Sequence, residues 1–418
     1  MAEIEPLRAL HYDLEKTGGL QPVVAPPYDV IDAEQRAELE ARSPYNVVRI
    51  DLPVGNDPYA EAGRLLAQWR EQGVIATDDR PALWALEQDY TGPDGQRRQR
   101  RGFLARVRVE EYGAGRIRPH ERTHPGPRED RLKLTRATKA NLSPIFSLFS
   151  DPDRAAWAAL APYATGAPWG EATDDDGTVN RLWHVADPAA LDAVTHALAG
   201  AELLIADGHH RYETARVYAE EVGGEGPQRY VLMCLVALQD PGVTVFPTHR
   251  LVRGLTSDQH GALAQALRRD FEIEPLGSNA RLAPEHGDRV RIGYIDSHFR
   301  RPYMLTLRDP AIADDALPDH AEPYRRLDTA VLEALILKGA LGKTDDAIDE
   351  LDGLRYARDF DQALELVQSG EYDAAFFMAP TPIEQVQAVA ETGESMPPKS
   401  TYFYPKVPTG LVFNSLVG

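Results

Sequence analysis

The chain of 418 residues contains a single cysteine, Cys234, so no disulfide can form within it. This cysteine lies in the apolar run 230–238, where we expect a buried and unreactive thiol. No stretch approaches the roughly 18 apolar residues that a membrane span needs, and we expect no membrane partner. The N-terminus also lacks the basic region and apolar run of a signal peptide, which favours a cytoplasmic protein.

Basic residues are scarce as well. The chain has 45 Lys and Arg residues against 65 Asp and Glu residues, which gives a formal net charge of −20 and a pI near 5.0. The phosphate backbone of a nucleic acid repels such a chain as a whole, so we expect no nucleic-acid partner. A local basic pocket for one small anion is compatible with this charge.

The length and the element pattern predict several lobes of mixed structure. At 418 residues the chain is too long for one ordinary core. Helix and strand patterns alternate, which predicts an α/β or mixed α+β fold. We divide the chain into an N-terminal mixed α/β lobe at 1–165, a central segment at 166–275 and a C-terminal α/β support region at 276–418. The Pro- and aromatic-rich tail, with Lys399 and Lys406, either returns to the site described next or forms an ordered surface strand.

The central stretch 202–215 carries more chemistry than any other segment. It reads Glu-Leu-Leu-Ile-Ala-Asp-Gly-His-His-Arg-Tyr-Glu-Thr-Ala. The apolar run 203–206 predicts a buried strand, and Asp207-Gly208 predicts the turn that ends it. A helix follows, and its apolar face consists of Tyr212, Ala215, Ala219 and Val222.

This strand, turn and helix start outline an anion site. Free backbone N–H groups and the positive end of the helix dipole meet there, and Arg211 adds a permanent charge. Asp207, His209 and His210 at the same corner could serve proton transfer or metal binding. A purely structural reading, with Asp207 as helix cap and Gly208 as turn residue, is the alternative. It does not explain the His-His-Arg run, because cations at this end of a helix are unfavourable unless an anion binds.

The N-terminal region offers weaker candidates. Residues 23–31 predict a short strand stopped by a Pro-Pro turn, and a helix follows at about 32–42. Tyr28 and Asp29 come just after the turn, where ligand contacts are common, although Asp29 could equally serve the turn itself. The segment 43–50 predicts an extended start that leads into a strand.

A basic helix is predicted at 127–141, which is unusual in so acidic a chain. Arg128, Arg131 and Lys139 could face an anion. Just before it, residues 119–125 spell Pro-His-Glu-Arg-Thr-His-Pro and contain the zinc-protease pattern H-E-x-x-H. That pattern needs both histidines on one helix face, and the flanking prolines exclude a long helix. We therefore interpret His120 and His124 as an accidental match.

Two further regions carry strand patterns. Residues 84–90 and 101–109 flank a hairpin turn, and the basic cluster beside it predicts a solvated surface formed by Arg97, Arg98, Arg100 and Arg101. Residues 243–252 predict a strand whose proline turn presents a polar tip with His249 and Arg250. These two residues would complement the 207–211 corner if their strands were neighbours.

Five motifs in chain order resemble the bacterial and archaeal family of unknown function numbered 1015. They are 24–30 (Val-Ala-Pro-Pro-Tyr-Asp-Val), 43–46 (Ser-Pro-Tyr-Asn), 207–211 (Asp-Gly-His-His-Arg), 247–250 (Pro-Thr-His-Arg) and 397–406 (Pro-Pro-Lys-Ser-Thr-Tyr-Phe-Tyr-Pro-Lys). The resemblance runs through nearly the whole chain. The family name itself implies no activity.

A more distant resemblance implies a fold and a chemistry. Gly208-His-His-Arg211, followed by Ala215, is similar to the G-x-x-R phosphate-binding motif of the ParB and sulfiredoxin superfamily, which includes free-serine kinases. The resemblance implies a ParB/sulfiredoxin-like core with additional α/β lobes, and phosphate roles for Gly208 and Arg211. A histidine stands where sulfiredoxins carry their catalytic cysteine, and the helix-turn-helix segment of partition proteins is not found. The kinase branch therefore fits best.

These observations predict phosphoryl transfer from a nucleotide, ATP or ADP with Mg²⁺, to the hydroxyl of a small metabolite such as a hydroxy amino acid. Asp207 or Glu213 would act as base, or Asp207 would help to hold Mg²⁺. His209 and His210 would steady the transferring group. The expected cofactor contacts are Gly208, Arg211, Arg128, Arg131, His249, Arg250, Tyr28, Asp29 and Lys399.

Two alternatives stay open from the sequence. A metal-dependent hydrolase would use an Asp/His ligand set made of Asp207, His209, His210 and His249. A non-catalytic sensor would bind a nucleotide or a phosphorylated metabolite and turn nothing over. The sequence leaves the oligomeric state open, and a homodimer is one expectation.

Overall fold

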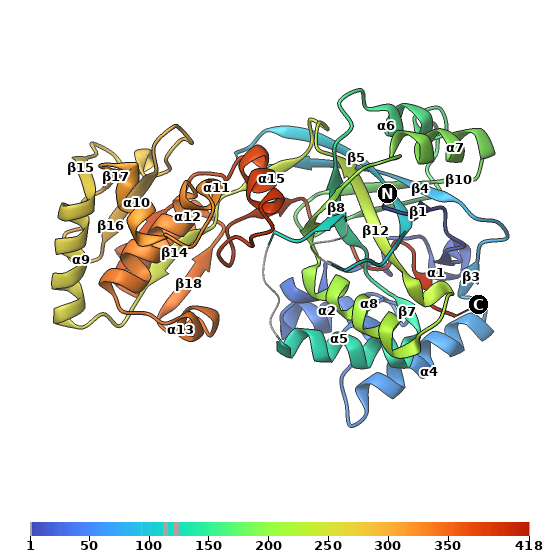
Figure 1. Ribbon diagram of the computed structural model, residues 1–418. Coiled ribbons are helices and arrows are strands. Elements are labelled where there is room, and N and C mark those ends of the chain that lie inside the picture. The colour runs from blue at the N-terminus through green and yellow to red at the C-terminus, as the bar shows by residue number, and fades with distance from the viewer. Residues whose placement is uncertain (1, 93, 112–115, 121–124, 418) are drawn as a thin grey trace. The chain divides into compact units, whose positions relative to one another are not determined.

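A computed structural model describes residues 2–92, 94–111, 116–120 and 125–417 (Figure 1). The chain forms two compact units, and both contain helices and sheets, which confirms the predicted mixed α/β class. The first unit consists of 1–119, 123–244 and 405–418, and the second of 120–122 and 245–404. The predicted lobe boundaries at 165/166 and 275/276 both fall inside a unit.

A large sheet organises the first unit. Its strands among the described residues are β1 (Ile4–Glu5), β4 (Leu83–Thr91), β5 (Arg97–Arg108), β6 (Ile117–Arg118), β8 (Ile145–Phe149), β9 (Gly170–Thr173), β10 (Val179–Val185), β11 (Leu203–Asp207) and β12 (Tyr230–Ala237). The order is β6-β11-β8-β12-β5-β4-β10-β9, and β1 pairs with β5. Because β12 lies between β5 and β8, the first two predicted lobes share one sheet.

Helices cover the first unit in two groups. The α-helices of this unit in the described part of the chain are α1 (Leu14–Thr17), α2 (Ala33–Arg42), α3 (Val48–Asp51), α4 (Pro58–Glu71), α5 (Pro125–Thr138), α6 (Ala155–Leu160), α7 (Pro188–Ala197) and α8 (His209–Val222). Figure 1 shows α2, α4, α5 and α8 gathered on one side of the strands and α6 and α7 on the other. The helix α8 therefore continues from β11 into a group of helices, which places the start of α8 beside α5.

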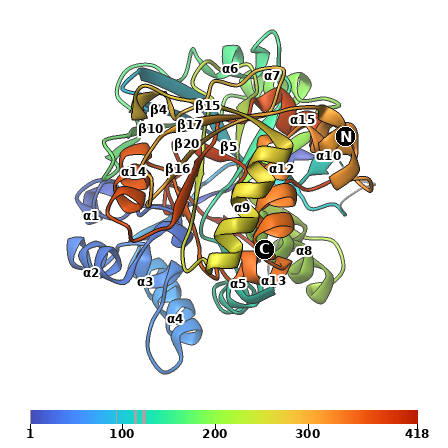
Figure 2. The same ribbon diagram turned by 90° about the vertical axis from the view of Figure 1, so that its left-hand side faces the viewer.

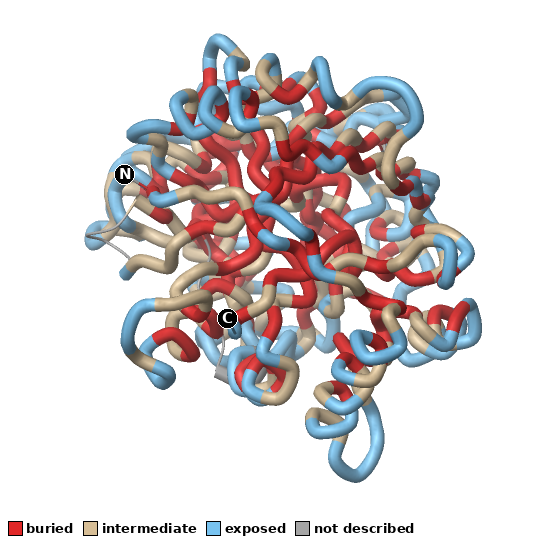
Figure 3. Tube along the Cα trace, turned by 90° about the vertical axis from the view of Figure 1, so that its right-hand side faces the viewer, coloured by how far each residue is buried: buried red, intermediate tan, exposed pale blue. Residues whose placement is uncertain are grey.

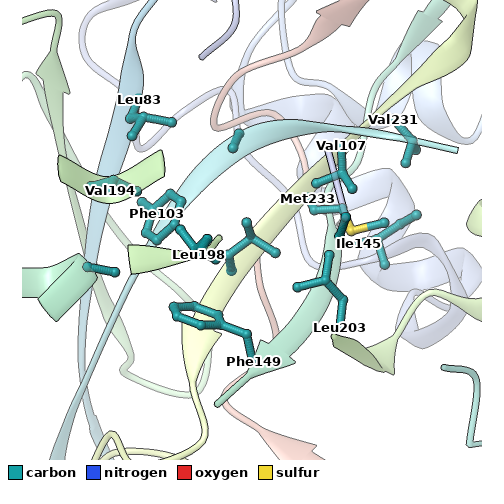
Figure 4. Packing of buried hydrophobic residues seen from close by; sticks show 14 of the residues in the cluster. Leu83, Phe103, Val107, Ile145, Phe149, Val194, Leu198, Leu203, Val231 and Met233 are labelled. Carbon is teal, nitrogen blue, oxygen red and sulfur yellow. The ribbon is translucent and has the colours of Figure 1, made fainter. Parts of the chain in front are cut away.

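Apolar side chains from β4, β5, β8, β11, β12 and α7 form the main core of the first unit. Figure 4 shows Phe103, Phe149 and Leu203 packed in this cluster, with the two phenyl ring centres 6.2 Å apart. Burying one such side chain contributes about 1.5–3 kcal/mol to folding. Buried residues gather in the interior of the molecule, and exposed residues lie in the peripheral loops (Figure 3). This packing holds the ends of β8 and β11 in fixed positions.

The second unit contains another sheet, with strands in the order β15-β17-β16-β19-β14-β18. These strands are β14 (His249–Val252), β15 (Phe271–Pro275), β16 (Arg291–Asp296), β17 (Tyr303–Leu307), β18 (Leu354–Ala357) and β19 (Ala374–Phe377). The strands β16 and β17 pair in antiparallel fashion. The helix α9 (Ser257–Asp270) and the π-helix Leu332–Ala340 pack on one face, and α14 (Phe360–Gln368) packs on the other (Figure 2).

The predicted strand at 43–50 is wrong. The short helix α3 (Val48–Asp51) lies there instead, although Val47, Val48 and Ile50 favour strands by propensity. Buried Asn46 explains the difference, because its side-chain oxygen accepts a hydrogen bond from the N–H of Val48 at 3.0 Å and starts the helical turn. Its amide group also donates to the carbonyl of Val24 at 3.1 Å, which joins two distant segments.

Two exposure predictions are also wrong. Arg100 is only 1% exposed, so the cluster beside the hairpin is not wholly solvated. Val222 was expected on the apolar face of α8, but it is 53% exposed because it lies in the last turn of that helix. The buried thiol of Cys234 is confirmed. Among the residues that the structure describes, no helix has the length and apolar character to cross a membrane.

Candidate functional site

The predicted strand, turn and helix start are confirmed. The strand β11 ends at Asp207, Gly208 has a φ of 100°, and α8 begins at His209. Gly208 is the N-cap of α8, and no side chain caps this end. The structural alternative in which Asp207 caps the helix is therefore wrong. A Cβ atom at Gly208 would also lie 2.9 Å from Nε of Arg211, so both the backbone conformation and the packed guanidinium require glycine here.

The carboxylate of Asp207 lies between two cations. Its Oδ1 accepts from Nζ of Lys406 at 2.7 Å, and its Oδ2 accepts from Nη2 of Arg211 at 2.7 Å. Burial alone would raise the pKa of Asp207, but the charges of Lys406 and Arg211 outweigh it and hold the pKa well below its ordinary range. Asp207 therefore stays ionised, and it is better suited to hold cations than to accept a proton.

Arg211 is held from three sides. Its Nη1 donates to the hydroxyl of Ser143 at 2.8 Å and to the carbonyl of Pro144, next to the start of β8. Ser143 in turn accepts from the hydroxyl of Thr409 at 2.9 Å. Nε of Arg211 is buried and has no hydrogen-bond partner within the described part of the chain. A buried donor without a partner costs about 1–3 kcal/mol, so such a group is a candidate contact for a ligand or an ordered water.

A pocket in the first unit adjoins Arg211. Arg131 of α5 lines it together with Tyr28, Asp51, Ser143 and Thr214. Arg131 is 6% exposed, and its Nη1 donates to the carbonyl of Asp51 at 2.8 Å and contacts Oδ1 of Asp51 at 3.2 Å. The guanidinium of Arg131 also lies 4.3 Å from the ring centre of Tyr28. The predicted residues Tyr28, Arg131 and Arg211 thus line one polar pocket.

Asp51 is a pocket residue that the sequence reasoning missed. Burial raises the pKa of this carboxyl, against the charges of Arg131 and Arg211. Burial likewise raises the pKa of Tyr28 to about 12. The misread segment 43–50 explains the omission, because only a helix at Val48–Asp51 turns Asp51 inward.

The sequence matches the family described as a protein of unknown function, DUF1015, over residues 4–330. The chain belongs to the DUF1015 family. The matched range includes the 207–211 motif, and the 397–406 motif lies beyond it. A search of the curated proteins finds no match to this DUF1015 chain. The predicted ParB/sulfiredoxin-like core stays a prediction.

Several solved structures resemble this DUF1015 chain at low similarity. A conserved hypothetical protein from Pyrococcus furiosus is 16% identical, with a TM-score of 0.36 and coverage of 72% of this chain and 94% of that chain. A free serine kinase in complex with AMP is 14% identical, with a TM-score of 0.35 and coverage of 71% and 89%. SbnI from Staphylococcus aureus, with a C-terminal truncation, is 12% identical, with a TM-score of 0.36 and coverage of 73% and 85%.

Other predicted residues do not line this pocket. His209 is buried, His210 is half-buried, and Glu213 accepts from Nη1 of Arg216 at 3.3 Å. At about 100° per residue, Glu213 lies roughly 200° around α8 from Arg211, on the face away from the pocket. Asp29 and Arg128 are exposed, and the carbonyl of Arg128 accepts from Thr214 at 3.4 Å.

Three predicted residues belong to the second unit of the DUF1015 chain. His249 and Arg250 lie in β14, which pairs with β18 and β19, whereas β11 pairs with β6 and β8. The two strands are therefore not paired neighbours. The residues are not an exposed tip either, because they are 2% and 3% exposed, and burial lowers the pKa of His249 to about 4. Nη2 of Arg250 donates to the carbonyl of Lys399 at 3.1 Å.

The structure gives no support to a metal centre among the described residues. No three His, Cys, Asp or Glu side chains are grouped there as metal ligands, so the hydrolase ligand set does not assemble in the described part. Of the H-E-x-x-H pattern, residues 121–124 lie outside the described residues. His120 is buried, and its Nε2 lies 2.8 Å from the hydroxyl of Thr401.

Proposed function

We propose that this DUF1015 chain binds the phosphate groups of a nucleotide and transfers a phosphoryl group to the hydroxyl of a small metabolite, such as a hydroxy amino acid. The observation that carries the proposal is the buried, unpartnered Nε of Arg211 beside Gly208. This N–H lies at the start of α8, where backbone N–H groups and the helix dipole also favour an anion. The guanidinium and the backbone of one helix start would bind the same phosphate.

Charge and position assign the supporting roles. Phosphoryl transfer depends mostly on positioning and charge neutralisation. Arg211 and Lys406 bring two positive charges to the single carboxylate of Asp207, which leaves a net positive corner for phosphate. Arg131 adds a third cation and a second guanidinium, although Asp51 and Asp130 already pair with it.

The geometry of the site changes which carboxylate we propose as the general base. Asp207 is a poor base because its pKa is depressed, and Glu213 faces away from the pocket. Asp51 lines the pocket and has a raised pKa, so we propose Asp51 as the proton acceptor for the substrate hydroxyl. Carboxylate oxygens suit Mg²⁺, which would neutralise phosphate charge, and Asp207 would hold it if Lys406 gave up Oδ1. His209 and His210 stay proposed to steady the transferring group, and Tyr28, Asp29 and Arg128 stay proposed cofactor contacts.

A non-catalytic nucleotide sensor is the second candidate. It is favoured by the depressed pKa of Asp207, because a carboxylate locked between two cations can orient Arg211 without taking part in any proton transfer. In that case the same corner would bind ADP or ATP, and no phosphorylated product would form.

The test is nucleotide binding to the wild type and two arginine variants. AMP, ADP and ATP are titrated with and without Mg²⁺ against the wild type, Arg211→Ala and Arg136→Ala, by thermal shift and calorimetry. Arg136 is a matched control, since it is 48% exposed and pairs with Glu221 on the helix surface. A ligand at 100 times its Kd stabilises the native state by about 2.7 kcal/mol. We expect this effect in the wild type and Arg136→Ala and its loss in Arg211→Ala.

Two results decide between the candidates. Equal nucleotide binding by Arg211→Ala and the wild type would refute the phosphate corner. If binding needs Arg211, the protein is incubated with ATP and serine or threonine, and a phosphorus NMR spectrum is recorded. A new signal from a phosphorylated hydroxy amino acid would favour the enzyme. Binding without a new phosphorus signal from any hydroxyl acceptor would favour the sensor.

A further inference from the structure

Arg100 is a buried guanidinium that pairs with no carboxylate among the residues that the structure describes. It lies in β5 and is 1% exposed. Its Nε and Nη2 both donate to Oε1 of Gln88, at 3.0 Å and 2.5 Å, and its Cζ lies 4.3 Å from the ring centre of Phe146. Nη1 is buried and has no hydrogen-bond partner among the described residues. One amide oxygen and one aromatic ring therefore hold a full positive charge.

A buried guanidinium of this kind destabilises the folded protein unless an anion or a hydrogen-bond acceptor compensates its charge. A buried charge that loses its partner destabilises a protein by about 3–5 kcal/mol, and a buried polar group without a partner commonly marks a site for water or an ion. Burial lowers the pKa of Arg100, and the charges of Asp240 and Asp207 oppose this from beyond ion-pair distance. An arginine side chain nevertheless remains protonated at neutral pH. The guanidinium of Arg100 therefore carries its positive charge, and no anionic group of the described residues lies at ion-pair distance from it.

Arg100 lies on the same face of the sheet as Asp207. Directly paired residues of neighbouring strands project from one face. Phe146, on which the guanidinium of Arg100 lies, pairs with Asp207 of β11 on one side and with Cys234 of β12 on the other. Cys234 pairs with Leu104, four residues along β5 from Arg100 and thus on its face. The sheet register brings the Arg100 side chain to the ring beside Asp207.

Hydrogen bonds join Arg100 to the Arg211 corner. Gln88, which accepts from Arg100, donates through Nε2 to the carbonyl of Lys406 at 3.1 Å. Lys406 contacts Asp207 at 2.7 Å, and Asp207 contacts Arg211 at 2.7 Å. Three positive charges and one negative charge thus lie along one connected path, with a net charge of +2. Within the described ranges, two buried donors at the ends of this path have no hydrogen-bond partner: Nη1 of Arg100 and Nε of Arg211.

We propose that Arg100 and Lys406 form a second anion subsite next to the Arg211 corner, so that the ligand carries two linked anionic groups. The ligand class is then a diphosphate or triphosphate, and a monophosphate fills only half of the site. This inference rests on the proposed function and deepens it. Lys406 would shift from Asp207 towards the second phosphate, and Nη1 of Arg100 would gain its missing acceptor.

The test compares pyrophosphate with orthophosphate, because neither probe carries a base or a sugar. Both are titrated by calorimetry against the wild type, Arg100→Met and Arg101→Met. Arg101 is the matched control, since it is the next residue in β5, projects from the opposite face and pairs with Glu87 at 3.3 Å. The wild type and Arg101→Met should bind pyrophosphate about 10- to 100-fold tighter than orthophosphate, the value of one charge-assisted hydrogen bond. Arg100→Met should lose that preference and keep orthophosphate binding.

A purely structural Arg100 predicts different results. Arg100→Met would then unfold more easily than the wild type and keep its preference for pyrophosphate, whereas our proposal expects an unchanged or raised melting temperature without ligand. Lys406→Met tests the subsite from its other side, and a retained preference in either variant overturns the proposal. If ADP binding depends on Arg211 but Arg100→Met still prefers pyrophosphate to orthophosphate, this inference alone is refuted. No binding of ADP or pyrophosphate to the wild type refutes the proposed function too.

Discussion

Gly208→Ala should destabilise the first unit more than an ordinary substitution at a left-handed glycine. The left-handed backbone alone costs a residue with a side chain about 1–2 kcal/mol. At Gly208 the new Cβ would also lie 2.9 Å from Nε and 3.0 Å from Cζ of Arg211. The guanidinium must then move, which weakens its bonds to Ser143 and Asp207, and hydrogen bonds to charged groups contribute about 1.5–3 kcal/mol each. If the shift costs the equivalent of one such bond, the total loss is about 2.5–5 kcal/mol.

The matched control is Gly200→Ala. Gly200 has a φ of 90°, and a Cβ there meets nothing within 4 Å, so only the backbone cost of about 1–2 kcal/mol remains. Urea denaturation measures both changes, provided that the m-value stays constant. In an Arg211→Ala background the clash disappears, and Gly208→Ala should then cost about as much as Gly200→Ala. Equal costs for the two glycines, or no relief in that background, would refute the packing argument.

Two further predictions concern titratable groups of the first unit. Burial alone would raise the pKa of Asp78, but hydrogen bonds with His11 and His184 lower it to about 2. The stability that this group contributes is present above its unfolded pKa of about 3.9 and is lost as the pH falls through about 2. The unfolding free energy of the wild type should therefore fall more steeply below about pH 4 than that of Asp78→Asn, with Asp79→Asn as a control that resembles the wild type. Burial raises the pKa of Cys234 to about 12, so iodoacetamide at pH 8 should alkylate it only in urea. Parallel pH profiles for all three proteins, or full labelling of native Cys234, would contradict these expectations.

Local signals were enough to predict the centre of the site. The apolar run at 203–206, the Asp207-Gly208 turn after it and the helical spacing of Tyr212 and Ala215 all act within a few residues of each other. The sequence therefore predicted the strand, the turn and the helix start correctly, as well as the burial of Cys234. The hairpin at 84–109 follows from a similar short-range pattern.

Interactions between distant segments explain what the sequence did not predict. Asn46 starts a helix where the side chains favour a strand, because its amide contacts a segment more than 20 residues away. That helix carries Asp51 into the pocket, opposite an arginine 80 residues later in the chain. Arg100 is buried because β5 pairs with Gln88 of β4, and no sequence pattern near position 100 reveals this. The errors at 43–50 and at Asp51 thus come from partners that are distant in the sequence, whereas Val222 was misjudged because it lies in the last turn of α8.

The location of the cations has a consequence for an anionic ligand. The chain as a whole carries −20 charges and repels such a ligand at long range, where salt screens the interaction over about 10 Å. Affinity must then come from cations that salt screens weakly, and Arg100 and Arg211 are buried or nearly so. An exposed basic patch would attract any polyanion. Buried donors in the sheet and at a helix start can contact only a ligand that is small enough to reach them. At the proposed site, the net negative charge of the chain and the buried guanidinium groups would together favour small, highly charged phosphates over nucleic acids.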